Sequence, residues 1–169
     1  VNYYDGQGFM VPRDLGVSSA KDLDGATVCI QTGTTTELNL ADYFRTNNIS
    51  YEPVPIETNA EAQQQYLAGA CDVYTTDASG LAATRATFEA PGDHVLLPEI
   101  ISKEPLGPLV RHGDNEWGDI ARWTLNALIT AEELGVTSAN IAELSAGTNN
   151  PEINRLLGTE GELGAMLGL

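Results

Sequence analysis

The feature of this 169-residue chain that most constrains its fold is a regular alternation of apolar runs and amphipathic segments between residues 24 and 97. The short apolar runs are typical of buried strands, and the segments between them place apolar residues at helical spacing. Strands that alternate with helices favour a parallel sheet covered by helices on both faces. We therefore predict an α/β fold, with strands at 27–30, 51–54, 71–74 and 94–97 and helices at 37–45, 60–68 and 79–88.

Two short apolar segments, 8–12 and 106–110, flank this unit, and each is followed by an arginine and then an acidic residue. We interpret them either as a pair of hinge strands, through which the chain enters and leaves a lobe, or as ordinary edge strands favoured by their prolines. Beyond them, residues 115–134 carry the pattern of an amphipathic helix. We expect Trp123, on the apolar stripe of that helix, to lie in a core.

Composition argues against several classes of function. Eight Lys and Arg against 24 Asp and Glu give a formal charge of −16, so nucleic acid and anionic lipid surfaces would be repelled. Cys29 and Cys71, with two histidines, show no metal-ligand spacing, so we expect no metal. The two cysteines form either a disulfide or two buried thiols.

Residues 1–5 lack the features of a signal peptide, and no apolar stretch is long enough to span a membrane. We expect the targeting segment of an exported protein to lie outside this sequence.

Three loops lead from predicted strands into helix N-termini, and ligands of parallel sheets bind at that edge. The first loop, 31–37, has Gly33 at its turn, followed by Thr34 and Thr35 at the positive end of a helix. This arrangement suits a carboxylate or a phosphate. Thr34 and Glu37 also have the spacing of a capping box, which any helix can use.

The second loop, 57–61, repeats the capping spacing and leaves Asn59 free to face the edge of the sheet. The third loop, 74–80, places Asp77 between a strand and a helix, where it either caps the helix or accepts hydrogen bonds from a cationic group. A hydroxyl-rich helix start and a nearby carboxylate together match the two charged groups of one α-amino acid.

Signatures of catalysis are weak. The sequence contains no nucleophile elbow, no phosphate-binding loop and no dinucleotide fingerprint. Asp77 with Glu99 or Glu104 offers an acid–base pair, but such pairs arise by chance in a chain this acidic. We therefore expect no enzymatic activity and no cofactor.

Three longer motifs are more specific: DGQGFMVP at 5–12, QTGTTTELNLADYF at 31–44 and CDVYTTDASGL at 71–81. They resemble the periplasmic general L-amino-acid-binding proteins of ABC transporters, and the resemblance runs along almost the whole chain. These are type II, Venus-flytrap binding proteins, in which two α/β lobes joined by two hinge strands clasp an amino acid.

The resemblance implies roles for individual residues. Thr34 and Thr35, with Gly33 in the same loop, match the grip on the ligand carboxylate, and Asp77 matches the partner of the α-ammonium group. Asn59 matches a position that faces the ligand side chain. The resemblance also implies strand order 2-1-3, which makes the strands of the two cysteines neighbours, and an oxidising periplasm allows a Cys29–Cys71 disulfide.

The resemblance further implies a chain cut off at both ends. We expect residues 1–12 to form a hinge and incoming strand, residues 5–101 the second ligand-binding lobe, and residues 102–169 a return hinge with an incomplete segment of the first lobe.

The implied function is periplasmic capture of an L-amino acid, with glutamate, glutamine, aspartate or asparagine preferred, and its delivery to a membrane permease. Neither a cofactor nor nucleic acid is expected to take part. Two alternatives use the same scaffold. One is a periplasmic enzyme such as a cyclohexadienyl or arogenate dehydratase, and the other is the sensor lobe of a receptor.

Overall fold

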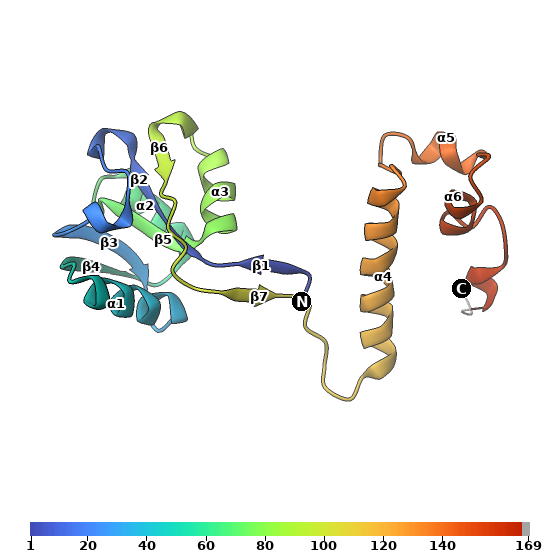
Figure 1. The fold of residues 1–169 in the computed structure, drawn as a ribbon, viewed down its shortest axis with the longest axis horizontal. Helices are drawn as coiled ribbons and strands as arrows, with labels where there is room; N and C mark the ends of the chain where they lie inside the picture. The colour runs from blue at the N-terminus through green and yellow to red at the C-terminus, as the bar shows by residue number, and fades with distance from the viewer. Residues whose placement is uncertain (167–169) are drawn as a thin grey trace. The chain divides into compact units, whose positions relative to one another are not determined.

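The computed structural model describes residues 1–166, and the chain divides into two compact units, Val1–Gly107 and Pro108–Leu169 (Figure 1). The first unit contains a five-stranded sheet in the order β4-β3-β5-β2-β6. Its strands are β2 (Gln7–Pro12), β3 (Ala26–Gln31), β4 (Tyr51–Ile56), β5 (Val73–Asp77) and β6 (His94–Leu96). Its helices are α1 (Thr35–Asn47), α2 (Asn59–Leu67) and α3 (Ala78–Ala86), with short 3₁₀ turns at Arg13–Leu15, Ala20–Asp22 and Pro91–Asp93.

The predicted α/β fold is confirmed, and each predicted strand and helix of residues 24–97 is present within a few residues of its expected bounds. Strands β3, β4 and β5 are parallel, in the expected order with β3 in the middle. The sheet as a whole is mixed, because β2 runs antiparallel to both β5 and β6.

The interpretation of segment 8–12 as an edge strand was wrong. This segment belongs to β2, which lies between β5 and β6 and is therefore an interior strand. Phe9, Met10 and Val11 are fully buried, because β2 is covered on both faces. Pro12, which suggested an edge, stands at the last position of the strand.

A two-stranded ribbon does form, and each of its strands begins a few residues before the corresponding predicted segment. Strand β1 (Tyr3–Asp5) pairs antiparallel with β7 (Glu104–Leu106). Of the predicted segment 106–110, only Leu106 lies in a strand. The pairing of segments 8–12 and 106–110 as hinge strands is therefore replaced by the pairing of β1 with β7.

Gly6, where β1 leads into β2, has no side chain and therefore allows residues 100–102 to approach its backbone closely. A Cβ at this position would overlap the carbonyl oxygen of Ser102 and the side chain of Ile100. The returning segment before β7 therefore rests directly on the backbone of Gly6, and any larger residue there would push it away.

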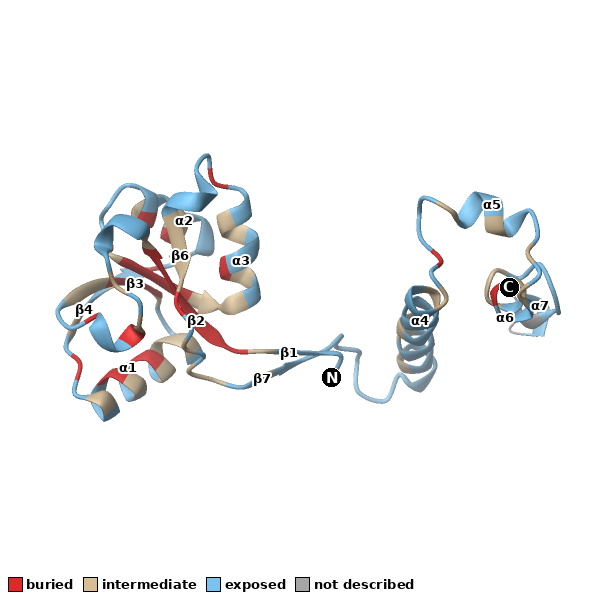
Figure 2. Cartoon of the chain, turned by 45° about the horizontal axis from the view of Figure 1, so that its top comes forward, coloured by how far each residue is buried: buried red, intermediate tan, exposed pale blue. Residues whose placement is uncertain are grey.

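The sheet separates two buried apolar clusters, and Figure 2 shows the buried residues concentrated along β2, β3 and β5. Helix α1 covers one face, and helices α2 and α3 cover the other (Figure 1). The α1 face buries Phe9, Val11, Val28, Ile30, Leu40, Phe44 and Val73. The opposite face buries Met10, Cys29, Tyr66, Cys71, Tyr74, Leu81 and Phe88.

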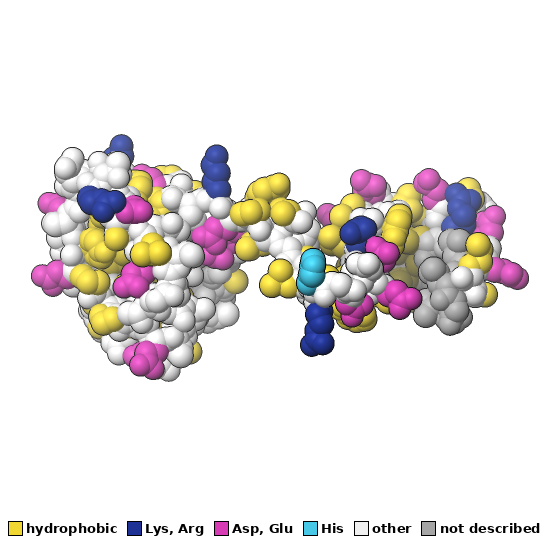
Figure 3. All heavy atoms as spheres, turned by 90° about the horizontal axis from the view of Figure 1, so that it is seen from below, with side chains coloured by type: hydrophobic (Ala, Val, Ile, Leu, Met, Phe, Trp, Pro, Cys, Tyr) yellow, Lys and Arg dark blue, Asp and Glu magenta, His cyan; other side chains and the backbone are white. Residues whose placement is uncertain are grey.

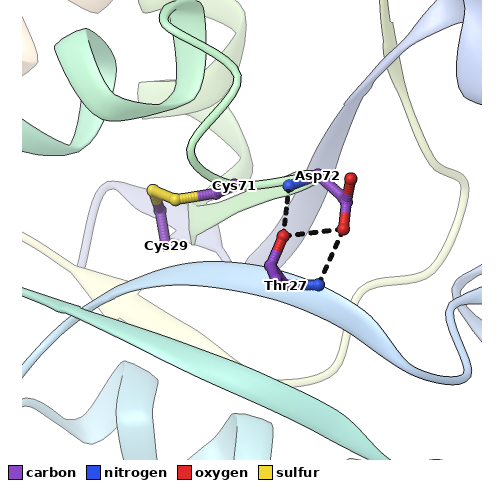
Figure 4. The surroundings of a disulfide bond; sticks show 4 residues. All are labelled: Thr27, Cys29, Cys71 and Asp72. Atoms are coloured by element: carbon purple, nitrogen blue, oxygen red, sulfur yellow. Dashed lines mark hydrogen bonds between the residues drawn. A yellow bond between two sulfur atoms is a disulfide. The ribbon is translucent and has the colours of Figure 1, made fainter.

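The predicted disulfide between Cys29 and Cys71 is present, with 5.5 Å between the two Cα atoms (Figure 4). Beside it, the backbone N–H and hydroxyl of Thr27 both donate to the Asp72 carboxylate, at 2.8 and 2.6 Å. The Asp72 N–H donates back to the Thr27 hydroxyl at 2.9 Å. The disulfide closes a sequence separation of 42 residues, worth about 4 kcal/mol of stability in the chain-entropy model.

The second unit consists of helices: α4 (Asn115–Glu133), α5 (Ile141–Ser145), α6 (Pro151–Leu156) and α7 (Leu163–Met166). Helix α4 confirms the predicted amphipathic helix, but none of its residues is buried. The expectation that Trp123 lies in a core was wrong for this chain, because its side chain is 67% exposed. Across residues 1–166, every helix is too short or too polar to cross a membrane.

Candidate ligand-binding site

The three loops predicted to bind a ligand emerge at one edge of the sheet. Because β3, β4 and β5 are parallel, their carboxyl ends lie at the same edge, and each leads directly into the N-terminus of a helix. Strand β2 runs in the opposite direction, so it begins at this edge, with Gln7 paired to Asp77.

The first loop shows both the turn and the cap that its sequence suggests. Gly33 has φ of 71°, in the left-handed region that favours glycine. The Thr34 hydroxyl accepts from the N–H of Glu37 at 3.3 Å and donates to the carbonyl of Gln31 at 2.7 Å. The Glu37 carboxylate accepts from the N–H of Gly33 at 2.8 Å. Local bonds thus occupy the Thr34 hydroxyl and the Gly33 N–H.

The start of α1 still presents donors beyond this cap. Thr35 and Thr36 are the first two helical residues, and helix geometry leaves their N–H groups without intrahelical partners. The Thr35 side chain is exposed, and no hydrogen bond from its hydroxyl is found among the described residues. These groups stand at the positive end of a 13-residue helix, where an anion is stabilised.

Asp77 does not cap the helix that follows it, since its side chain makes no cap hydrogen bond to α3. Asp5 accepts at that helix start instead, from the N–H of Ser79 at 3.3 Å and from the Ser79 hydroxyl. Although burial opposes the shift, hydrogen bonds from Ser79 and Gly6 lower the pKa of Asp5. The capping interpretation of Asp77 therefore fails, and its carboxyl is available for another partner.

The Asp77 carboxyl lies in an acidic environment. Burial, followed by the neighbouring Glu104 and Asp5 carboxylates, raises the pKa of Asp77 to about 6. Glu104, in β7, is close enough to share a hydrogen bond with Asp77, and it also accepts from the Ser102 hydroxyl at 2.7 Å. A cationic group bound here would relieve the repulsion between these carboxylates.

Sequence reasoning named Glu104 only as a chance partner of Asp77 and missed Asp5 as a constituent of the site. The signal for Asp5 was present in the motif at 5–12. What could not be seen was that the ribbon of β1 and β7 brings Asp5 opposite Glu104.

A cavity of about 190 Å³ opens beside Asp77. It brings Asp77 together with Asn59, the first residue of α2. Gly33, Thr34 and Thr35 do not line it. The residues that line the cavity are Asn59, Gln63, Tyr74, Thr76, Asp77, Ser79, Gly80 and Thr84.

A larger hollow of about 700 Å³ lies at the opposite end of β2, beside Pro12 and His94. None of the predicted ligand residues lines it. The cavity beside Asp77 is therefore the better candidate site, because Asp77 and Asn59 line it.

Acidic side chains occur on both units on the face drawn in Figure 3, and they do not gather in one patch there.

Comparison with known proteins gives a close match over the whole chain. The chain is 68% identical over 169 residues to the glutamate/glutamine/aspartate/asparagine-binding protein BztA of Rhodobacter capsulatus. It is 58% identical over 171 residues to the general L-amino acid-binding periplasmic protein AapJ of Rhizobium johnstonii. Both matches cover 100% of this chain and 50% of the relative, so the chain spans about half the length of these curated relatives. No family model matches the chain.

Solved structures share the fold. An ABC transporter periplasmic binding protein from Brucella ovis, solved with glutathione bound, has 54% identity and a TM-score of 0.85. That match covers 100% of this chain and 54% of the other. An ancestral arginine-binding protein bound to arginine has 25% identity and a TM-score of 0.56, with 80% of this chain and 57% of the other covered.

The fold and these matches give the chain the fold class of the type II periplasmic binding proteins. More closely, the chain corresponds over its whole length to one half of the amino-acid-binding proteins of ABC transporters. The family resemblance, the fold class and the periplasmic location predicted from the sequence are confirmed.

Proposed function

We propose that this chain supplies one ligand-binding lobe of a periplasmic protein that captures L-amino acids and delivers them to the permease of an ABC transporter. The observation that carries the proposal is the whole-chain match to binding proteins named for amino acids. The edge geometry supports it, since a helix N-terminus and a carboxylate that caps no helix lie at the ends of parallel neighbouring strands.

In this proposal the N–H groups of Thr34 and Thr35 and the hydroxyl of Thr35 bind the ligand carboxylate at the first turn of α1, and Gly33 shapes the loop. Asp77 binds the α-ammonium group. Asn59 faces the ligand side chain from the start of α2, beside the same cavity as Asp77.

We infer a preference for glutamate, glutamine, aspartate or asparagine. One relative is named for these four ligands, and the cavity beside Asp77 offers hydrogen-bonding groups from Asn59, Gln63 and Thr84. Because those groups accept and donate, they suit an acidic or amide side chain better than an aliphatic one.

The division into a hinge and incoming strand at 1–12, a second lobe at 5–101 and a first-lobe segment at 102–169 stays a prediction. We propose that the ribbon of β1 and β7 is the hinge and that closure of two lobes around the ligand presents the surface recognised by the permease. The dehydratase alternative gains no support from the relatives, which are named as binding proteins.

Titration calorimetry of the full-length protein tests the site. L-Glutamate should bind the wild type, and Asp77→Asn should weaken binding at least about 30-fold, because an ammonium group loses its charged partner. Thr35→Val should weaken it about 10-fold, the effect of one hydrogen bond to a charged group. Asp42→Asn, an exposed carboxylate paired with Arg45, is the control and should bind normally. Unchanged affinity in Asp77→Asn would reject the proposed site.

A further inference from the structure

Gln7 is a fully buried polar residue at the start of β2, and the binding roles proposed above do not use it. Its side-chain amide donates to the carbonyl of Thr36 at 3.1 Å and to the hydroxyl of Thr75 at 3.0 Å. Burial of a glutamine side chain has a free-energy cost that an apolar residue of the same size would avoid, because every buried polar group requires a hydrogen-bond partner. The presence of Gln7 between two elements therefore points to a role beyond filling space.

The orientation of the Gln7 amide is set by its partners. The Thr75 hydroxyl donates its one proton to the carbonyl of Gly8 at 2.7 Å, so it can only accept from Gln7. The Thr36 carbonyl is also an acceptor. The amide nitrogen must therefore face both groups, and the Gln7 Oε1 atom is left buried without a hydrogen-bond partner among the described residues.

The two partners of Gln7 stand directly beside the proposed ligand groups. Thr36 follows Thr35 in the first turn of α1. Thr75 lies in β5, two residues before Asp77. The backbone of Gln7 is fixed as well, since its N–H donates to the Ser102 hydroxyl at 2.9 Å and its carbonyl accepts from the Ile101 N–H at 2.9 Å.

We propose that Gln7 is a positioning residue that sets the spacing between the first turn of α1 and Asp77. It thereby selects ligands whose carboxylate and ammonium groups share one carbon atom. This inference rests on the proposed function, in which those two elements bind the two charged groups. Gln7 touches no ligand in this account, and it acts by holding the helix start and the strand end at one separation.

The test compares two isomers that differ in the spacing of the charged groups, L-glutamate and the achiral β-glutamate (3-aminopentanedioic acid). Their dissociation constants are measured by calorimetry on the full-length protein. Gln7→Met keeps the length of the side chain and removes both donors. It should reduce the preference for L-glutamate over β-glutamate by at least about fivefold, the equilibrium effect of one neutral hydrogen bond. Gln64→Met, an exposed glutamine of α2, is the matched control and should leave the ratio within about twofold.

A purely structural role for Gln7 would lower thermal stability and leave this ratio unchanged, and that result overturns the inference. If Gln7→Met does not fold, Thr75→Val is measured instead, because it releases the same amide from β5, and the same shift is expected. A wild-type protein that binds neither isomer nor any other amino acid contradicts the proposed function itself and removes the inference with it. Binding with an unchanged ratio contradicts the inference alone.

Discussion

The two units of this chain use similar amphipathic patterns with different results. In Val1–Gly107 the sheet buries apolar side chains on both faces, because α1 covers one and α2 and α3 cover the other. In the described part of the second unit only Val136 and Ile153 are buried hydrophobic residues. The pattern of α4 specifies the helix, but it does not supply the surface that would cover it.

Helix α4 leaves several large apolar side chains exposed. They are Trp117, Ile120, Trp123, Leu128 and Ile129, each at least 46% exposed. The first unit therefore contains both sides of its core within its own sequence, whereas the described part of the second contains one side.

The sharpest test of this contrast removes one large aromatic side chain from each unit. Phe44→Ala should destabilise the chain by about 3–5 kcal/mol, because Phe44 is fully buried and packs on Phe9, Tyr43 and Tyr51. Trp123→Ala should change stability by less than about 0.5 kcal/mol, because its side chain is exposed. Urea unfolding followed by circular dichroism measures both, and an equal loss in the two variants would break the comparison.

Helix caps allow a smaller, matched test. The Thr34 hydroxyl caps α1 in the first unit, and the Asn150 side chain caps α6 in the second, accepting from the N–H groups of Glu152 and Ile153. Thr34→Ala should lower the free energy of cooperative unfolding by about 1 kcal/mol. Asn150→Ala should leave that transition unchanged and reduce only local helix content. A loss of cooperative stability in Asn150→Ala would show that the second unit folds together with the first.

A third test concerns the pH dependence of the first unit. Burial and the nearby Glu104 and Asp5 carboxylates raise the pKa of Asp77 to about 6, above its unfolded value of 3.8. The folded protein therefore binds more protons than the unfolded chain between these values, and this residue reduces stability as pH rises through that window. Asp77→Asn should raise the melting temperature at pH 7 and have little effect at pH 3.5. Thermal unfolding at the two pH values measures this, and a gain of equal size at both would contradict the assignment.

The sequence predicted the parts of the fold that depend on local pattern. Strands β3, β4 and β5 and their helices follow from periodicity, and Thr34 follows from the spacing of a helix cap. The interior position of β2 could not be derived in this way. An apolar run does not say which strand it will pair with, and the partners of Phe9 and Met10 in β5 are more than 60 residues away.

The residues of the candidate site were likewise predictable only where they follow from local sequence pattern. Asp77 was found because it ends a strand and begins a helix, and Asn59 because it follows a capping residue. Asp5 was missed and Glu104 undervalued, because their positions depend on the close passage at Gly6 and on the pairing of β1 with β7. Trp123 was misplaced because amphipathicity predicts a buried face without showing what buries it.

The measurement that tests the central claim most directly is a crystal structure of the full-length protein with L-glutamate. The ligand carboxylate should lie within hydrogen-bond distance of Thr35 at the start of α1. The ammonium group should lie beside the carboxylate of Asp77, with Asn59 facing the side chain. A ligand bound away from Thr35 and Asp77, for example in the hollow beside His94, would contradict the account.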